Sequence, residues 1–231
     1  MNPLSGVLKE AWQLYRNHAV HLLTIAFVIY LSAAVIAAIL SLAGLFGALL
    51  ASIVQIIAAF LVQAALVKAV QDVRDGRADL SLGETVSAAM PYLGRVAAAS
   101  ILAGIGIVIG FALLVVPGLY LLTIWSLIVP AIVIGQAGMF TAFSRSFDLV
   151  RGFSWRVFGT YVLVFLILIV LNIVIALILA ALPAVARNGI STVVSGTLVA
   201  PMLALVVTLI YYRLYAAHSG GASPDAGPGM A

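Results

Sequence analysis

The sequence carries very little charge for its size. Only 8% of its 231 residues are charged and 65% are hydrophobic, whereas a soluble domain has about 25% charged residues. So little charge cannot keep a surface of this size in water, so the composition indicates an integral membrane protein. The net charge of +4 does not indicate nucleic-acid binding, because the basic residues lie in short segments between apolar runs and form no single basic face.

Cysteine is absent, which excludes disulfides, thiolate chemistry and cysteine metal sites. The sequence also lacks the groupings of enzyme sites: there is no serine–histidine–acid set, no carboxylate pair and no phosphate-binding loop. His18 and His21 are spaced like two metal ligands, but no carboxylate accompanies them on that turn. We therefore expect no catalytic residue, no metal and no cofactor, and a protein that is not an enzyme.

Six apolar runs are long enough to cross a bilayer, whose hydrocarbon core of about 30 Å needs roughly 20 residues of helix. None alternates apolar and polar residues as a membrane β-barrel strand does. The sequence thus predicts an all-α fold with six transmembrane helices near His21–Leu42, Ala48–Val70, Val96–Val116, Leu119–Gln136, Val157–Leu182 and Ile190–Tyr212. We expect a membrane domain over residues 1–215 and a disordered, Gly/Pro/Ser-rich tail over residues 216–231.

Lysine and arginine fall on alternate connections between these spans. Ten of the eleven basic residues lie on one side, and only Arg187 lies on the other. Because basic residues are enriched in cytoplasmic connections, we expect both termini in the cytoplasm and the chain in the cytoplasmic membrane.

A weak internal repeat accompanies the spans. The segment "WQLYRNHAVH" (Trp12–His21) aligns with "FDLVRGFSWR" (Phe147–Arg156), and "SLGETVSAAMPYLGRV" precedes the third span, with Ser81 and Glu84 at the spacing of a capping box. We expect three units, each an amphipathic helix lying in the membrane interface and followed by a hairpin of two spans. The alternative is that any cytoplasmic approach to a span looks amphipathic.

The stretch from Thr141 to Arg156 is the most distinctive of these approaches. Arg145, Asp148 and Arg151 follow one another at a spacing of three residues, which allows mutual pairing on a helix. Arginines at a membrane surface attract anionic lipid headgroups. The residues that we expect to contact lipid phosphates are Arg16, Arg95, Arg145, Arg151 and Arg156.

Within the spans, ionisable residues are missing at mid-membrane, which argues against a proton- or ion-coupled pump. The neutral residues Gln55, Gln63 and Asn172 could line a polar groove for a lipid headgroup or a solute; the alternative is that they form hydrogen bonds between helices. Gly106 and Gly110 could form a dimer contact or, as we prefer, permit close packing within the helix bundle. Pro130 is expected to kink the fourth span.

Residues Val116–Gly159 resemble a prokaryotic family named for the membrane domain of glycerophosphoryl diester phosphodiesterases. The matching features are Pro117-Gly118, Trp125-Ser126, Pro130 and the run from Ala142 to Arg156. The resemblance implies a six-helix prokaryotic membrane protein. It does not carry over the phosphodiesterase activity, because 231 residues leave no room for the soluble barrel of the fused members. An acidic residue that the family often has after this proline is replaced here by Gly135-Gln136.

Together these features favour a non-enzymatic, polytopic membrane protein that interacts with lipid or acts as a membrane scaffold or accessory. The alternative is a transporter or facilitator of a lipid or small amphiphilic solute. The expected partners are the bilayer and anionic lipid headgroups, without nucleic acid, while a protein partner or a homo-oligomer stays open.

Overall fold

The computed structural model describes residues 3–74, 80–181, 184–220 and 224. Over these residues the chain forms helices and no strand, which confirms the all-α prediction. In chain order they are α1 (Val7–Asn17), α2 (Ala19–Ser41), α3 (Gly44–Arg74), α4 (Leu82–Leu113), α5 (Val115–Ile124), α6 (Ile128–Val133), α7 (Met139–Val150), α8 (Ser154–Ile178), a short 3-10 turn (Leu179–Ala181) and α9 (Ala184–His218).

Six of these segments are long and apolar enough to cross a membrane, as the sequence predicts. They are α2, α3, α4, α5 with α6, α8 with the 3-10 turn, and the part of α9 from Ile190 onward. Several helices continue past the expected ends of the spans, because the polar residues there also favour helix. Helix α9, for example, ends at His218 rather than near Tyr212, so residues 216–218 of the predicted disordered tail are helical. Most of the rest of that tail lies outside the described residues.

The spans pair into three hairpins, and the turns of the first two are very short. Helices α2 and α3 are joined by Leu42 and Ala43. Gly44, the first residue of α3, has a φ of 70°, which glycine adopts readily because it has no Cβ. Helices α4 and α5 are joined by Leu114 alone, whose backbone is extended. This break precedes Pro117, which lies in the first turn of α5, where proline is tolerated because the first N–H groups of a helix have no partner within it.

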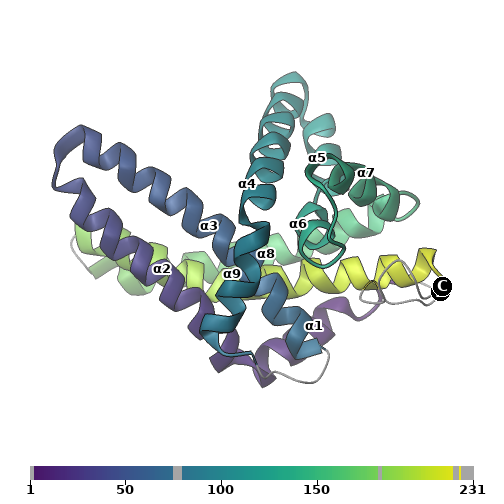
Figure 1. Cartoon of the computed structure of the whole chain (residues 1–231), viewed down its shortest axis with the longest axis horizontal. Coiled ribbons are helices and arrows are strands. Elements are labelled where there is room, and N and C mark those ends of the chain that lie inside the picture. The colour runs from purple at the N-terminus through teal and green to yellow at the C-terminus, as the bar shows by residue number, and fades with distance from the viewer. Residues whose placement is uncertain (1–2, 75–79, 182–183, 221–223, 225–231) are drawn as a thin grey trace.

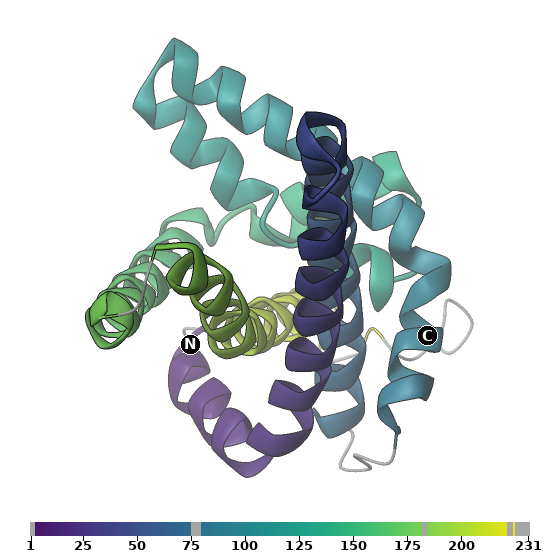
Figure 2. The same ribbon diagram turned by 90° about the vertical axis from the view of Figure 1, so that its left-hand side faces the viewer.

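The hairpins diverge from one another. The turn of the α4–α5 hairpin lies far from that of the α2–α3 hairpin, as Figures 1 and 2 show. The tips are correspondingly bare: the exposed fraction is 85% for Leu42, 75% for Val116 and 70% for Leu177. Apolar surface of this extent suits contact with lipid rather than water.

The buried core lies at the opposite end of the hairpins, which we term the base. There α1, α7 and the α6 part of the fourth span pack against the other spans. The fully buried side chains of the core include Leu22, Ile25, Leu66, Leu127, Ile132, Leu209, Ile210 and Tyr211. Packing at the base therefore holds the three hairpins together, and it positions the cavities described below.

Glycines on α4 permit close packing inside the second hairpin. A Cβ at Gly106 would lie 2.6 Å from the Trp125 ring, and one at Gly110 would lie 3.1 Å from the Cα of Gly118. Both glycines thus face the partner helix of their own hairpin. This arrangement favours packing within the protein over the dimer contact that the sequence also allowed.

The three predicted repeat units are not built alike. Helices α1 and α7 each precede a hairpin as separate short helices. The middle unit has no such helix, because α4 runs without a break from Leu82 through Pro91 into the span. The predicted capping box at its start is confirmed: Ser81 Oγ accepts from the Glu84 N–H at 3.3 Å, and the Ser81 N–H donates to Glu84 Oε2 at 2.8 Å.

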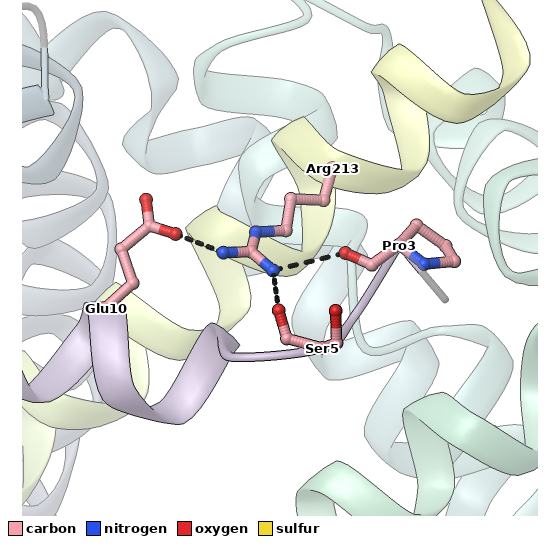
Figure 3. Close-up of polar contacts among 4 residues, drawn as sticks. All are labelled: Pro3, Ser5, Glu10 and Arg213. Carbon is pink, nitrogen blue, oxygen red and sulfur yellow. Dashed lines mark hydrogen bonds and ion pairs between the residues drawn. The ribbon is translucent and has the colours of Figure 1, made fainter. Parts of the chain in front are cut away.

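The two ends of the described chain are fastened to each other at the base. Arg213, near the end of α9, forms an ion pair with Glu10 on α1 and donates a hydrogen bond of 3.2 Å to the Pro3 carbonyl (Figure 3). A further hydrogen bond reaches the carbonyl of Ser5. One guanidinium therefore holds both α1 and the segment before it against the last span.

Candidate functional site

The fourth span is broken near its middle. Helix α5 ends at Ile124, residues 125–127 form a turn, and α6 begins at Ile128. We expected Pro130 to kink this span; instead the break lies upstream of it, and Pro130 occupies the first turn of α6. Proline fits that position for the same reason as Pro117 does in α5.

Ser146 on α7 supplies hydrogen bonds that the break would otherwise lack. Its hydroxyl donates to the Ile124 carbonyl at 2.6 Å and accepts from the Leu127 N–H at 3.2 Å. The Ser146 side chain is fully buried, and buried backbone groups need partners because no water reaches them. The separate helix α7 is thereby linked directly to the centre of a membrane span.

A cavity of about 330 Å³ lies beside this break, between α2, α3, α6 and α9. Its polar lining groups are Tyr30, Gln63 and Ser126, and its remaining walls are aliphatic. The Tyr30 ring packs over Gly196, where an added Cβ would approach the ring to 2.8 Å. Ser126 donates to the Thr123 carbonyl at 2.8 Å, so its hydroxyl oxygen can still accept a hydrogen bond. We term this space the inner cavity.

A larger apolar cavity adjoins the inner cavity. It has a volume of about 680 Å³ and lies between α5, α8 and α9, with Phe111 of α4 at its edge. Val199 and Leu203 on α9 line both cavities, so the two spaces share a wall. The polar residues of this outer groove, as we term it, are Tyr161 and Asn172.

Tyr161 is the unusual residue of the outer groove. Its hydroxyl oxygen is buried and makes no hydrogen bond that meets normal geometry with any described residue, although it faces Ser126 of the inner cavity. Asn172 differs, because its amide donates to the Leu168 carbonyl of its own helix at 2.8 Å. A buried hydroxyl without a partner is rare in proteins and demands an explanation.

A third, polar cavity of about 590 Å³ lies at the base. Arg145 forms one wall: its guanidinium donates to the Gly135 carbonyl at 2.8 Å and lies 5.5 Å from the centre of the Tyr215 ring. Asp148 and His218 also line this space. The basal cavity has no lining residue in common with the inner cavity or the outer groove.

The five arginines expected to contact lipid phosphates have different surroundings. Arg16, Arg151 and Arg156 are exposed. Arg95 is half-buried and lies 5.2 Å from the centre of the Tyr92 ring, and Arg145 is half-buried in the contacts described above. Arg145 donates to the Gly135 carbonyl instead of forming the expected ion pair with Asp148. The ion pair found in the described part of the chain joins Arg213 to Glu10.

The three residues of the expected polar groove do not lie together. Gln63 lines the inner cavity, Asn172 lines the outer groove, and Gln55 lines neither. Asn172 satisfies its amide within its own helix. The spacing of Gln55 and Gln63 could not reveal this, because it fixes a shared helix face but not which neighbour that face meets.

His18 and His21 lie beside a cavity that Arg16 also lines. The buried ring nitrogens Nδ1 of His18 and Nε2 of His21 make no hydrogen bond to described residues. Across the described residues, no three His, Asp or Glu side chains are grouped so that they could hold a metal ion.

Ser146, Tyr30 and Tyr161 are not predicted from the sequence. Serine at position 146 looks like one polar residue among several on α7, and both tyrosines look like ordinary residues of apolar spans. Nothing in the local sequence marks them, because their importance arises from helices that are distant along the chain. The one usable signal was Trp125-Ser126, a polar interruption ahead of Pro130 in an apolar run.

Comparison with known proteins identifies a family. No curated protein and no solved structure matches the chain. The family described as a domain of unknown function, DUF7847, matches residues 77–218. This range includes the second and third hairpins, α7 and the broken span, and it covers more than half of the 231 residues. The chain therefore belongs to the DUF7847 family.

Proposed function

We propose that the protein is a non-enzymatic membrane protein that binds a lipid between its diverging hairpins. The observation that carries this proposal is a pair of adjacent cavities. The outer groove is almost wholly apolar, and it shares Val199 and Leu203 with an inner cavity that contains polar groups. Together they offer apolar walls to a hydrocarbon chain and polar groups to a headgroup, which is the complement of an amphiphile.

The size of the cavities supports the same proposal. Ligand sites typically have volumes of about 300–1,000 Å³ and are mostly apolar, with a few placed polar groups. Both the inner cavity, at about 330 Å³, and the outer groove, at about 680 Å³, lie in that range. The groove is built from spans, so a lipid would enter it sideways from the bilayer rather than from water.

The exposed arginines support a matching orientation in the membrane. We propose that Arg16, Arg151 and Arg156 contact anionic headgroups of the cytoplasmic leaflet, each contributing about 1 kcal/mol near the surface. Both termini then lie in the cytoplasm. Arg145 is engaged by Gly135 and Tyr215, so we assign it to holding the base together. Kinship with the glycerophosphodiesterase membrane-domain family stays a proposal that rests on residues 116–159.

Native mass spectrometry of the protein, released from discs of its own membrane lipid, tests this function. We expect a lipid retained at a fixed stoichiometry. Leu203→Trp, which places an indole in the shared wall of the two cavities, should abolish retention, and Val199→Phe should weaken it. The matched control is Leu166→Trp on α8, whose side chain is 53% exposed and lines neither cavity. Equal lipid retention by all four proteins would overturn the proposal.

A transporter or facilitator is the second candidate, and the break in the fourth span favours it. Broken helices build binding sites at mid-membrane in many transporters, and here Ser126 of the break lines the inner cavity. Against it, the basal cavity shares no lining residue with the inner cavity, so the two do not form one polar route. Movement of a fluorescent lipid between leaflets of reconstituted vesicles would distinguish transport from binding alone.

A further inference from the structure

We infer that the ligand of the outer groove and the adjacent inner cavity is an uncharged amphiphile whose hydroxyl or carbonyl group bonds to Tyr161. This inference rests on the proposed lipid-binding function and specifies its ligand. It follows from two independent features, the absence of charge in the lining and a buried tyrosine hydroxyl that faces Ser126 without a hydrogen bond of normal geometry.

The first feature is electrostatic. None of the described residues that line the inner cavity or the outer groove is charged. A phosphate or carboxylate moved from water into an apolar space needs a cation beside it, because its lost hydration is otherwise uncompensated. The guanidinium of Arg145 belongs to the basal cavity instead. A phospholipid headgroup is therefore a poor occupant, and a neutral headgroup is a good one.

The second feature is the hydrogen-bonding capacity of the polar end. The Tyr161 hydroxyl is buried and faces Ser126, but it makes no hydrogen bond of normal geometry, so a ligand oxygen placed between the two residues could accept its proton. Ser126 already donates its own proton to Thr123, so its oxygen can accept one. A ligand hydroxyl could accept from Tyr161 and donate to Ser126, and a ligand carbonyl could accept from Tyr161. Tyr30 and Gln63 add further polar groups on the inner side.

The apolar walls of the outer groove determine the chemistry of the remainder of the ligand. Leu119, Phe158, Phe165, Leu168 and Ile169 line the outer groove, which would enclose a hydrocarbon chain. The chemistry that fits is thus a long-chain alcohol or an acylglycerol, a class distinct from the charged phospholipids that make up most of a bilayer.

Monoolein, an uncharged glycerol ester with one acyl chain, is a suitable probe, and phosphatidylglycerol is its charged counterpart. Both would be titrated against the delipidated, detergent-solubilised protein and followed by native mass spectrometry. We expect monoolein to bind as one adduct with higher affinity than phosphatidylglycerol. Tyr161→Phe should weaken monoolein binding about tenfold, the effect of one lost hydrogen bond.

The matched control is Tyr92→Phe, which removes a hydroxyl from a tyrosine that lines neither cavity and should leave binding unchanged. Two results would overturn the inference while leaving the proposed function standing: preferential binding of phosphatidylglycerol that Leu203→Trp abolishes, or monoolein binding that Leu203→Trp abolishes and Tyr161→Phe leaves intact. Failure of both lipids to bind, or binding indifferent to Leu203→Trp, would instead overturn the proposed function itself.

Discussion

The hydroxyl of Ser146 donates a 2.6 Å hydrogen bond to the carbonyl of Ile124, the last residue of α5. The same oxygen accepts from the backbone on the far side of the break, at Leu127. A residue of a short helix at the base therefore completes the hydrogen bonding of a span that is interrupted near its middle. A movement of α7 would therefore also displace the residues of the break, among them Ser126, which lines the inner cavity.

Replacing Ser146 should therefore destabilise the protein. Ser146→Ala leaves a buried carbonyl and a buried N–H without partners, so we expect the free energy of unfolding to fall by about 1–3 kcal/mol. Unfolding of the detergent-solubilised protein by SDS titration measures this. Ser144→Ala is the matched control, because the exposed Ser144 hydroxyl bonds only to the Thr141 carbonyl of its own helix. Equal effects of the two substitutions would contradict the assigned role.

Gly135 should not tolerate a side chain. A Cβ there would lie 2.4 Å from the Tyr211 hydroxyl oxygen and 2.8 Å from the Ala131 carbonyl oxygen. Gly135→Ala should lower the free energy of unfolding by about 1–3 kcal/mol through overpacking, and should disturb the hydrogen bond to Arg145. Gly159→Ala on α8 is the control: its Cβ would meet nothing within 4 Å, so stability should hold or rise by up to about 1 kcal/mol.

Packing inside the second hairpin can be tested at Gly106. The Trp125 ring is held between this glycine and Phe143, whose ring centre lies 5.2 Å away, so it cannot yield to a methyl group. In a background with Trp12 and Trp155 replaced by phenylalanine, Gly106→Ala should shift the Trp125 fluorescence and cost about 1–3 kcal/mol of stability. Gly104→Ala, where a Cβ would meet nothing within 4 Å, should leave the spectrum unchanged.

The fastening of α1 to α9 should control the mobility of the N-terminal segment. Arg213→Ala removes the ion pair with Glu10 and the bonds to the Pro3 and Ser5 carbonyls. Because the side chains of Arg213 and Glu10 are 27% and 38% exposed, the loss should be modest, about 1 kcal/mol. Hydrogen exchange in residues 3–10 should rise several-fold. Glu10→Gln should have a smaller effect, since it keeps both carbonyl contacts; an effect equal to that of Arg213→Ala would show that the ion pair dominates.

Orientation in the membrane can be tested by labelling single introduced cysteines, because the chain has no cysteine of its own that would react. We expect a cysteine at Ser219→Cys, after the last span, to react with a membrane-impermeant maleimide only once cells are permeabilised. A cysteine at Ala43→Cys, in the turn of the first hairpin, should react in intact cells. The reversed pattern would contradict the orientation inferred from the lysines and arginines.

Much of the architecture follows from the sequence alone. Spans are apolar runs of a length that the bilayer sets, and a helix satisfies its backbone hydrogen bonds locally, so hydropathy was sufficient to predict six of them. The start of α4 at Ser81 and Glu84 was predictable for the same reason, because a capping box involves only neighbouring residues. The position of the break in the fourth span was missed by a few residues, since proline marks a helix start as readily as a kink.

Only the tertiary structure decided what these helices form together. Ser146 meets Ile124 across 22 positions, and the inner cavity unites Tyr30, Ser126 and Gly196 from three distant segments. Lipid is as apolar as the side chains that pack within it, so apolar periodicity does not show which face of a span meets protein and which meets lipid. The charge pattern could place arginines at the base, but close packing alone determined that Arg145 turns inward to Gly135 while Arg151 and Arg156 stay exposed.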